Sequence, residues 1–263
     1  MPMLKFITLA AFLVFTLPCA WAAPPDDVLA AGPSGVVATV IDGDTVRLKD
    51  GDADIRLIGL QAPKLPLGRK GFKAWPLADE AKAALKGFAL NKDVRVRLGT
   101  SARDRHGRML AHVVRADDVW VQAEMLRLGL ARVYTFPDNR ALAAEMLAIE
   151  TEARRAKRGI WGHPFYAVRD ALSPGLADDN GTFQIVRGTV TDAAKTKERV
   201  YLNFGADYRS DFTVSVEKRD WRMFEAAGID LLAFKGKTIE ARGWIVKRNG
   251  PMIEATHPEQ ISR

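Results

Sequence analysis

Cysteine is almost absent from this chain, because the 263 residues include only Cys19. Cys19 belongs to a short N-terminal leader, in which an early lysine, an apolar run over 6–17 and an Ala-Trp-Ala site ending at Ala22 follow one another. This order is typical of a cleaved signal peptide, which we place at residues 1–22. After cleavage the chain would hold no thiol, and this excludes disulfides, thiolate catalysis and cysteine-ligated zinc.

Long hydrophobic runs are also missing. The apolar run of the leader is shorter than the roughly 20 residues that a membrane-spanning helix needs. The composition, 48% hydrophobic and 27% charged, fits neither a disordered chain nor a protein with several membrane spans. We therefore expect a globular protein that is exported to the periplasm or secreted, with no membrane insertion after the signal peptide is removed.

Negative charge is in the minority, since 39 Lys and Arg outnumber 32 Asp and Glu and leave a net charge of +7. A basic protein attracts polyanions, nucleic acid foremost, because binding neutralises phosphates and releases counterions. Composition alone also allows a solvated basic surface without a specific partner.

The length favours one large or two modest domains. Residues 164–181 are rich in Pro, Gly, Asp and Asn and lack periodicity, so we place a linker there. The expected organisation is a flexible lead-in at 23–35, a first domain at 36–163 and a second domain at 182–263.

Alternating and helical hydrophobic patterns predict the elements of both domains. In the first domain we expect strands at 36–41, 45–49, 53–59, 94–98 and 109–114, a loop at 65–76, and helices at 77–90, 119–128 and 139–157. In the second we expect strands at 183–191, 199–204, 212–216, 238–246 and 252–255, and a helix at 217–227. The fold class is β-rich α+β: an OB-fold barrel with additional helices, followed by a second, smaller OB-like β-barrel.

Three segments of the first domain concentrate charged residues of both signs: 40–46, 55–64 and 104–110. Residues two apart on a strand share a face, so Asp42 and Asp44 can project together towards Arg56 on a neighbouring strand. Paired carboxylates that face arginines suit a site for a metal and a phosphate. Solvent-facing salt bridges on a hairpin are the simpler alternative.

These segments, followed in order by 128–133 and 157–161, resemble the staphylococcal nuclease family from Val36 to Trp161. The resemblance covers about half of the chain. It implies an OB barrel with three helices, and calcium-dependent hydrolysis of the phosphodiesters of DNA and RNA.

The resemblance also implies roles for individual residues. Asp44 would bind calcium, the main-chain carbonyl of Thr45 would be another ligand, and Asp42 would be an acidic neighbour behind them. Arg56 and Arg108 match the two arginines that grip the scissile phosphate.

A second group of residues matches positions that contact the nucleotide. Arg105 and His106 would lie near a phosphate. Tyr134 and Phe136 align with aromatic residues that flank the bound base, where stacking tolerates any sequence. They could equally pack against the last helix of the first domain.

Two positions depart from the family pattern. Gln61 stands where a second calcium-binding aspartate is expected, which removes one negative charge from the calcium site. Lys64 stands at the position of the general base, and a lysine of ordinary pKa is a cation that accepts no proton. We expect weakened hydrolysis with retained nucleic-acid binding. An active calcium-dependent nuclease and a non-catalytic cell-envelope scaffold are the alternatives. A Lys64 pKa lowered by burial beside the arginines is one way in which hydrolysis could be retained.

The second domain resembles a C-terminal module that accompanies some bacterial nuclease-like domains, through segments such as 200–205 and 249–251. Its Trp221, Trp244, Lys247 and Arg248 could form an aromatic and basic face for nucleic acid. Tryptophans buried in a small barrel are the alternative.

Overall fold

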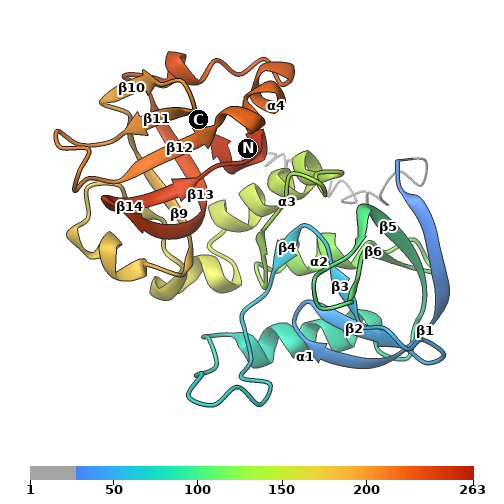
Figure 1. Ribbon diagram of the computed structural model, residues 1–263. Helices are drawn as coiled ribbons and strands as arrows, with labels where there is room; N and C mark the ends of the chain where they lie inside the picture. Colours follow the sequence, from blue (N-terminus) through green and yellow to red (C-terminus); the bar gives the residue numbers. More distant parts are fainter. Residues whose placement is uncertain (1–27) are drawn as a thin grey trace, which may run out of the picture.

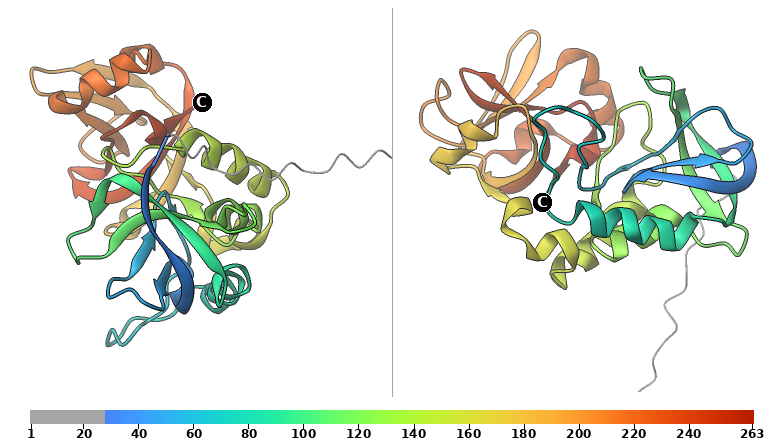
Figure 2. Two further views of the ribbon diagram at one scale, coloured as in Figure 1. Left: turned by 90° about the vertical axis from the view of Figure 1, so that its right-hand side faces the viewer. Right: turned by 90° about the horizontal axis from the view of Figure 1, so that it is seen from below.

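A computed structural model describes residues 28–263 of the protein. The predicted signal peptide, with Cys19, lies outside the described residues. Within them, every helix is too short or too polar to cross a membrane. Figure 1 and the two further views in Figure 2 show two β-structures side by side, with helices packed around the first.

The first β-structure is a closed barrel with the strand order β1-β2-β3-β6-β5. Its strands are β1 (Ala30–Asp42), β2 (Thr45–Leu48), β3 (Ile55–Leu57), β5 (Asp93–Arg103) and β6 (Met109–Arg115). β1 closes the barrel because it is long enough to pair with both β2 and β5, and β3 and β6 run parallel. The OB fold expected for this part of the chain is confirmed.

The start of β1 differs from the sequence-based expectation. Ala30 already pairs with Leu98, and Gly35 pairs with Val94, so these residues form sheet instead of a flexible lead-in. Sequence reasoning missed this pairing because Ala, Gly, Pro and Ser have low β-propensity, whereas here the neighbouring strand β5 orders them.

Three helices cover the barrel: α1 (Ala78–Ala89), α2 (Val121–Arg127) and α3 (Ala143–Arg155). A short antiparallel pair, β4 (Leu60–Gln61) with β7 (Arg132–Val133), connects the site region to the chain before α3. The expected start of α3 at Asn139 is wrong. The side chain of Asn139 bonds both the N–H and the C=O of Ser101 on β5, and this holds residues 136–139 as a turn.

The second β-structure is an eight-stranded sheet with the order β10-β11-β12-β14-β13-β9-β8, with β15 on β13. Its strands are β8 (Arg169–Asp170), β9 (Phe183–Thr189), β10 (Asp192–Lys195), β11 (Arg199–Asn203), β12 (Thr213–Glu217), β13 (Thr238–Arg248), β14 (Gly250–Glu254) and β15 (Ile261–Ser262). β12 and β14 run parallel, as β3 and β6 do in the first barrel.

The chain continues directly from β9, near one end of this sheet, into β10, at the other end. β9 pairs with β13 and β10 pairs with β11, and only Val190 and Thr191 separate β9 from β10. Their N–H groups donate to Lys237 O and Asn203 O, so β9 and β10 act as one bent first strand of an OB-like barrel. The helix expected at 217–227 is shorter: a 3-10 turn at Lys218–Asp220 precedes α4 (Trp221–Ala226).

Alternate residues of β13 join the two barrels. Such residues share one face of a strand, and on β13 this face contacts the first barrel and α3 (Figure 1). The contacts are Glu240 with Arg154 at 2.8 Å, Arg242 with Glu150 at 2.9 Å, and Trp244 with Tyr134 at 2.9 Å. The Arg242–Glu150 pair is buried, with side-chain exposures of 6% and 1%.

We expect Glu150→Gln to destabilise the protein by about 3–5 kcal/mol, because it leaves the buried Arg242 cation without its counter-charge. Urea unfolding measures the change. Glu152→Gln, on the same helix, is the control: its pair with Arg155 is exposed (66% and 72%), so it should cost less than about 1 kcal/mol. Equal losses in the two variants would contradict the role of the buried pair.

His257 also lies at the interface. Its Nε2 bonds Thr135 Oγ1 at 2.8 Å and its Nδ1 bonds Thr256 Oγ1 at 3.0 Å. Burial lowers the pKa of His257 from 6.5 to about 4, while Glu259 and Asp138 oppose the shift and Arg140 adds to it.

Because the unfolded chain binds this proton first, His257 contributes stability that is complete above pH 6.5 and is lost as the pH falls towards 4. Between pH 6 and 5, the wild-type free energy of unfolding should fall more steeply than that of His257→Gln, by about 1.2 kcal/mol per pH unit. Equilibrium unfolding at several pH values measures both slopes. Identical slopes would show that His257 is not buried as a neutral group.

Candidate functional site

Asp44 is the centre of the candidate site. It lies in the turn between β1 and β2, with 0% of its surface exposed. Its Oδ2 accepts hydrogen bonds from Lys64 Nζ at 2.5 Å and from the main-chain N–H of Ala62 at 2.8 Å, and lies 3.2 Å from Arg56 Nη2. Gly43 precedes it because a Cβ there would lie 2.7 Å from the Cβ of Ala62. The carboxylate is thus enclosed by donors from the protein itself.

Arg56, on β3, is turned into the protein. Its Nη1 donates to Leu57 O at 2.8 Å and to Asp44 O at 3.2 Å, and its Nη2 donates to Leu60 O at 2.8 Å. The chain from 57 to 60 bends around the guanidinium and occupies several of its donors, and contact of Arg56 with a phosphate stays a prediction. In this arrangement Arg56 holds the turn that carries Gln61 and Lys64.

The charges of the site are strongly coupled. Burial alone would raise the pKa of Asp44, but Arg56 and Lys64 together outweigh it and hold the pKa well below its usual range. Burial and the nearby Asp44 raise the pKa of Asp42, against the influence of Lys64 and Arg56. Burial, with Arg56, lowers the pKa of Lys64, and both carboxylates oppose that shift. Lys64 thus supplies positive charge to a buried pair of carboxylates.

The donor set does not fit calcium. Calcium takes six to eight oxygen ligands, most of them carboxylates and carbonyls. The Oε1 atom of Gln61 instead accepts two hydrogen bonds from Arg132, at 3.0 and 2.7 Å. The main-chain carbonyl of Thr45 as a calcium ligand stays a prediction. An ammonium group already lies 2.5 Å from Asp44 Oδ2. Among residues 28–263, no three His, Cys, Asp or Glu side chains group as a metal site would require.

The β5–β6 turn carries the other expected phosphate ligands. Asp104 accepts from the N–H groups of His106 and Arg108 and from Arg108 Nε at 2.7 Å. The side chains of Arg105 and His106 are exposed and contact each other at 3.2 Å. Arg56 pairs with Leu110 in parallel register, so Arg108, just before the start of β6, lies near the end of the strand pair that carries Arg56.

The structure thus brings Asp42, Asp44, Arg56 and Lys64 together. The guanidinium of Arg108 pairs with Asp104 at 2.7 Å and, within residues 28–263, forms no ion pair with Asp44.

Tyr134 packs against the second barrel. Its ring meets that of Phe183, on β9, edge-on at 4.9 Å, and its hydroxyl accepts a hydrogen bond from Trp244. Phe136 meets Tyr134 at 4.8 Å and is 48% exposed. Of these two aromatic residues, Phe136 has the ring that is exposed enough to stack on a base.

Arg132 is a site residue to which sequence reasoning gave no role. It holds Gln61, and its guanidinium lies 4.6 Å above the ring of Phe183. Burial lowers the pKa of Arg132 to about 10. The only sign of this role in the sequence is that a charged residue stands within the apolar run of 130–133. That pattern does not indicate which residue the arginine binds.

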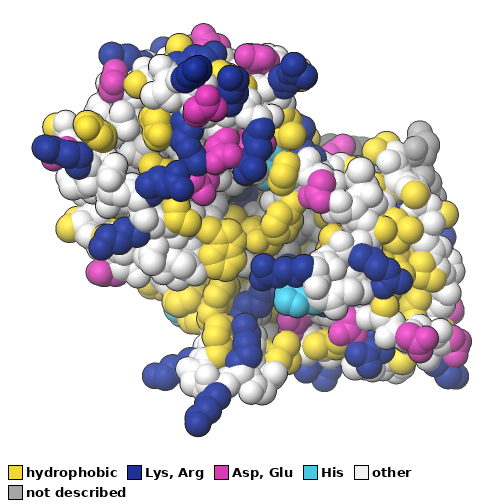
Figure 3. All heavy atoms as spheres, in the orientation of Figure 1, with side chains coloured by type: hydrophobic (Ala, Val, Ile, Leu, Met, Phe, Trp, Pro, Cys, Tyr) yellow, Lys and Arg dark blue, Asp and Glu magenta, His cyan; other side chains and the backbone are white. Residues whose placement is uncertain are grey.

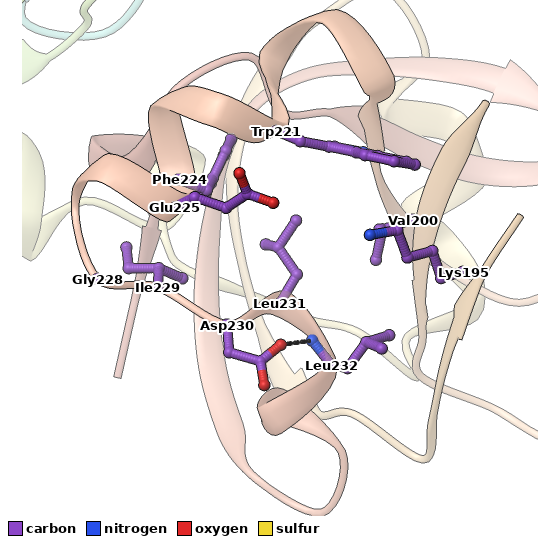
Figure 4. A pocket seen from close by; sticks show the side chains of 10 residues that line it. All are labelled: Lys195, Val200, Trp221, Phe224, Glu225, Gly228, Ile229, Asp230, Leu231 and Leu232. Atoms are coloured by element: carbon purple, nitrogen blue, oxygen red, sulfur yellow. Dashed lines mark hydrogen bonds between the residues drawn. The ribbon is translucent and has the colours of Figure 1, made fainter. Parts of the chain in front are cut away.

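A separate pocket of about 380 Å³ lies in the second barrel, between α4, the 3-10 turn Leu231–Phe234 and the strands β10 and β11. Figure 4 shows Trp221 as one wall, with the amine of Lys195 turned towards its ring, 4.2 Å from the ring centroid. The indole N–H of Trp221 donates to Val216 O, so this tryptophan is part of the barrel wall.

Comparisons with known proteins agree with the fold of the first barrel. The model of the family described as staphylococcal nuclease homologue matches residues 54–163. A thermonuclease of Staphylococcus intermedius is 31% identical over 132 residues, which are 49% of this chain and 77% of that protein. An uncharacterized endonuclease of Escherichia coli O157:H7 is 32% identical over 161 residues, 60% of this chain and 90% of that protein.

A thermonuclease of Staphylococcus hyicus is 30% identical over 134 residues, 48% of this chain and 75% of that protein. The fold and these similarities define a nuclease-type OB protein. The chain belongs to the staphylococcal nuclease family.

We expect Asp44→Asn to destabilise the protein by about 3–5 kcal/mol, because the buried cations Arg56 and Lys64 lose their common counter-ion. Chemical unfolding measures the loss. Asp54→Asn is the matched control, since the Arg47–Asp54 pair is more exposed and should contribute about 1 kcal/mol or less. If Asp44→Asn unfolds at the same urea concentration as the wild type, the three charges do not stabilise the fold.

Proposed function

We propose that this protein binds the phosphodiester backbone of DNA or RNA, and that Lys64 replaces the metal at Asp44, so that calcium-dependent hydrolysis is weakened. One observation carries the proposal: the ammonium of Lys64 lies 2.5 Å from the carboxylate oxygen of Asp44. The predicted export to the periplasm or the exterior belongs to the same proposal.

Electrostatics oppose calcium beside this ammonium. Two unit charges 4 Å apart interact by about 4 kcal/mol at an effective dielectric constant of 20, and a divalent ion doubles that repulsion. Gln61 adds no negative charge to offset it, and its amide oxygen is held by Arg132. Binding calcium would require both Lys64 and Arg132 to move.

The general-base function is opposed by the same contact. A base must be deprotonated and must reach the proton of the attacking water. Lys64 donates a hydrogen bond to Asp44, so its ammonium is engaged by the carboxylate. Burial lowers the pKa of Lys64, but Asp44 and Asp42 oppose that shift. The site therefore favours a closed salt bridge over proton abstraction.

Binding of phosphate relies on the β5–β6 turn. Arg105 and His106 are exposed there, and the side chain of Arg108 is 34% exposed with its Nη1 free of the contacts that Asp104 makes to Nε and Nη2. Guanidinium groups donate paired hydrogen bonds to phosphate oxygens. The net charge of +7 adds a sequence-independent attraction.

The test is binding and cleavage of labelled DNA and RNA by the purified full chain, with calcium and with a chelator. We expect salt-dependent binding that the chelator leaves unchanged, and little cleavage under either condition. Arg105→Ala should reduce the slope of log affinity against log salt by about 0.7–0.9, the contribution of one phosphate contact.

Lys82→Ala, on α1 and away from the β5–β6 turn, is the control for a general loss of charge. Calcium-dependent cleavage that Asp44→Asn abolishes would establish an active nuclease and overturn the proposal. Absence of binding even at low salt would overturn it in favour of a cell-envelope scaffold.

A further inference from the structure

Trp244 is an exposed tryptophan in a fixed orientation. It is 44% exposed, and its indole N–H donates to the hydroxyl of Tyr134 at 2.9 Å. Its ring stands nearly perpendicular to those of Tyr134 (74°) and Phe183 (78°). The contacts hold the ring by its edges, so it needs little further ordering when a ligand binds.

A second exposed aromatic residue lies beside it. Phe136 comes from the first barrel, is 48% exposed and meets Tyr134 at 4.8 Å, while Trp244 meets the same ring at 6.5 Å. Phe136 and Trp244 thus flank Tyr134, one from each barrel. Figure 3 shows a band of hydrophobic side chains where the two lobes meet, with Lys and Arg side chains along its borders.

Basic groups lie at both ends of this band. Arg248 lies on the same face of β13 as Trp244, and its side chain is 54% exposed. On the other barrel, residues 136–139 are bonded to Ser101 on β5, the strand that leads to the turn with the exposed Arg105 and His106. Exposed aromatic rings between cationic groups match a strand of phosphates with unpaired bases.

Two acidic residues near the band are paired with cations, whereas Asp138, in the same turn as Phe136, is exposed and accepts a hydrogen bond from the hydroxyl of Ser101. Asp104 binds Arg108, and Glu254 is shared by Arg199 and Arg248. Their pairing reduces the repulsion that a phosphate would meet.

We infer that the second barrel extends the nucleic-acid surface, with Trp244 stacking on an unpaired base and Arg248 contacting a phosphate of the same strand. The inference rests on the proposed function, and it specifies single-stranded nucleic acid. A duplex gains less from this surface, because its base faces are already stacked on one another.

The test is fluorescence anisotropy of the full chain with a labelled oligothymidylate of about 12 nucleotides, and with a duplex of the same length. Trp244→Leu removes the ring and should weaken single-strand binding about 5- to 150-fold, the range of one base–aromatic stack. Its duplex affinity should stay within about 2-fold of the wild type, because the surface takes unpaired bases.

Trp244→Phe separates stacking from structure. Phe keeps a stacking face and loses the hydrogen bond to Tyr134, so it should keep most of the single-strand affinity. Trp221→Leu is the matched control in the same barrel, and it should leave both affinities unchanged, because Lys195 covers its ring. Arg248→Ala changes an exposed side chain, so it tests the surface even if Trp244→Leu does not fold, and it should lower the salt slope by about 0.7.

The outcomes separate the two claims. If the wild type binds no nucleic acid, the proposed function and this inference both fail. If the wild type binds and Arg105→Ala weakens it, while Trp244→Leu and Arg248→Ala have no effect, only the inference fails. Equal losses for single strand and duplex in Trp244→Leu would also overturn it.

Discussion

The contact between Lys64 and Asp44 sets the charge balance of the candidate site in the first barrel. A buried carboxylate without a partner is costly, so Asp44 requires cations, and the fold supplies Arg56 and Lys64 from the chain that follows β2. Arg56 in turn fixes residues 57–60 through their carbonyls. The buried charges around Asp44 are therefore balanced by cationic groups of the protein.

Buried polar contacts also connect this region to the second barrel. Gln61 is held by Arg132, whose guanidinium lies on the ring of Phe183 in β9. The buried pair of Arg242 and Glu150 anchors the neighbouring strand β13 to α3. Arg132 therefore connects position 61 to the second barrel.

The strands of the first barrel could be predicted from hydrophobic alternation. The grouping of Asp42, Asp44 and Arg56 was also predicted, but for a different reason: Asp44 lies in the turn after β1, so it is the turn, and not the two-residue period of one strand, that brings it to Arg56. The inward orientation of Arg56 could not be predicted, since it depends on how the chain bends after β3. The pairing of Ala30 with β5 and the contact between Tyr134 and Phe183 join residues far apart in the sequence. Local sequence patterns do not indicate which distant residues will be in contact. The signal peptide and the domain boundaries stay predictions.

Calcium titration by isothermal calorimetry tests the replacement of the metal by Lys64 most directly. The wild type should show no binding heat at millimolar calcium, whereas a Gln61→Asp, Lys64→Glu double variant, which removes the ammonium and adds two carboxylates beside Asp44, should bind calcium. If the wild type binds calcium as tightly as the double variant, Lys64 does not occupy the place of the metal, and the account is contradicted.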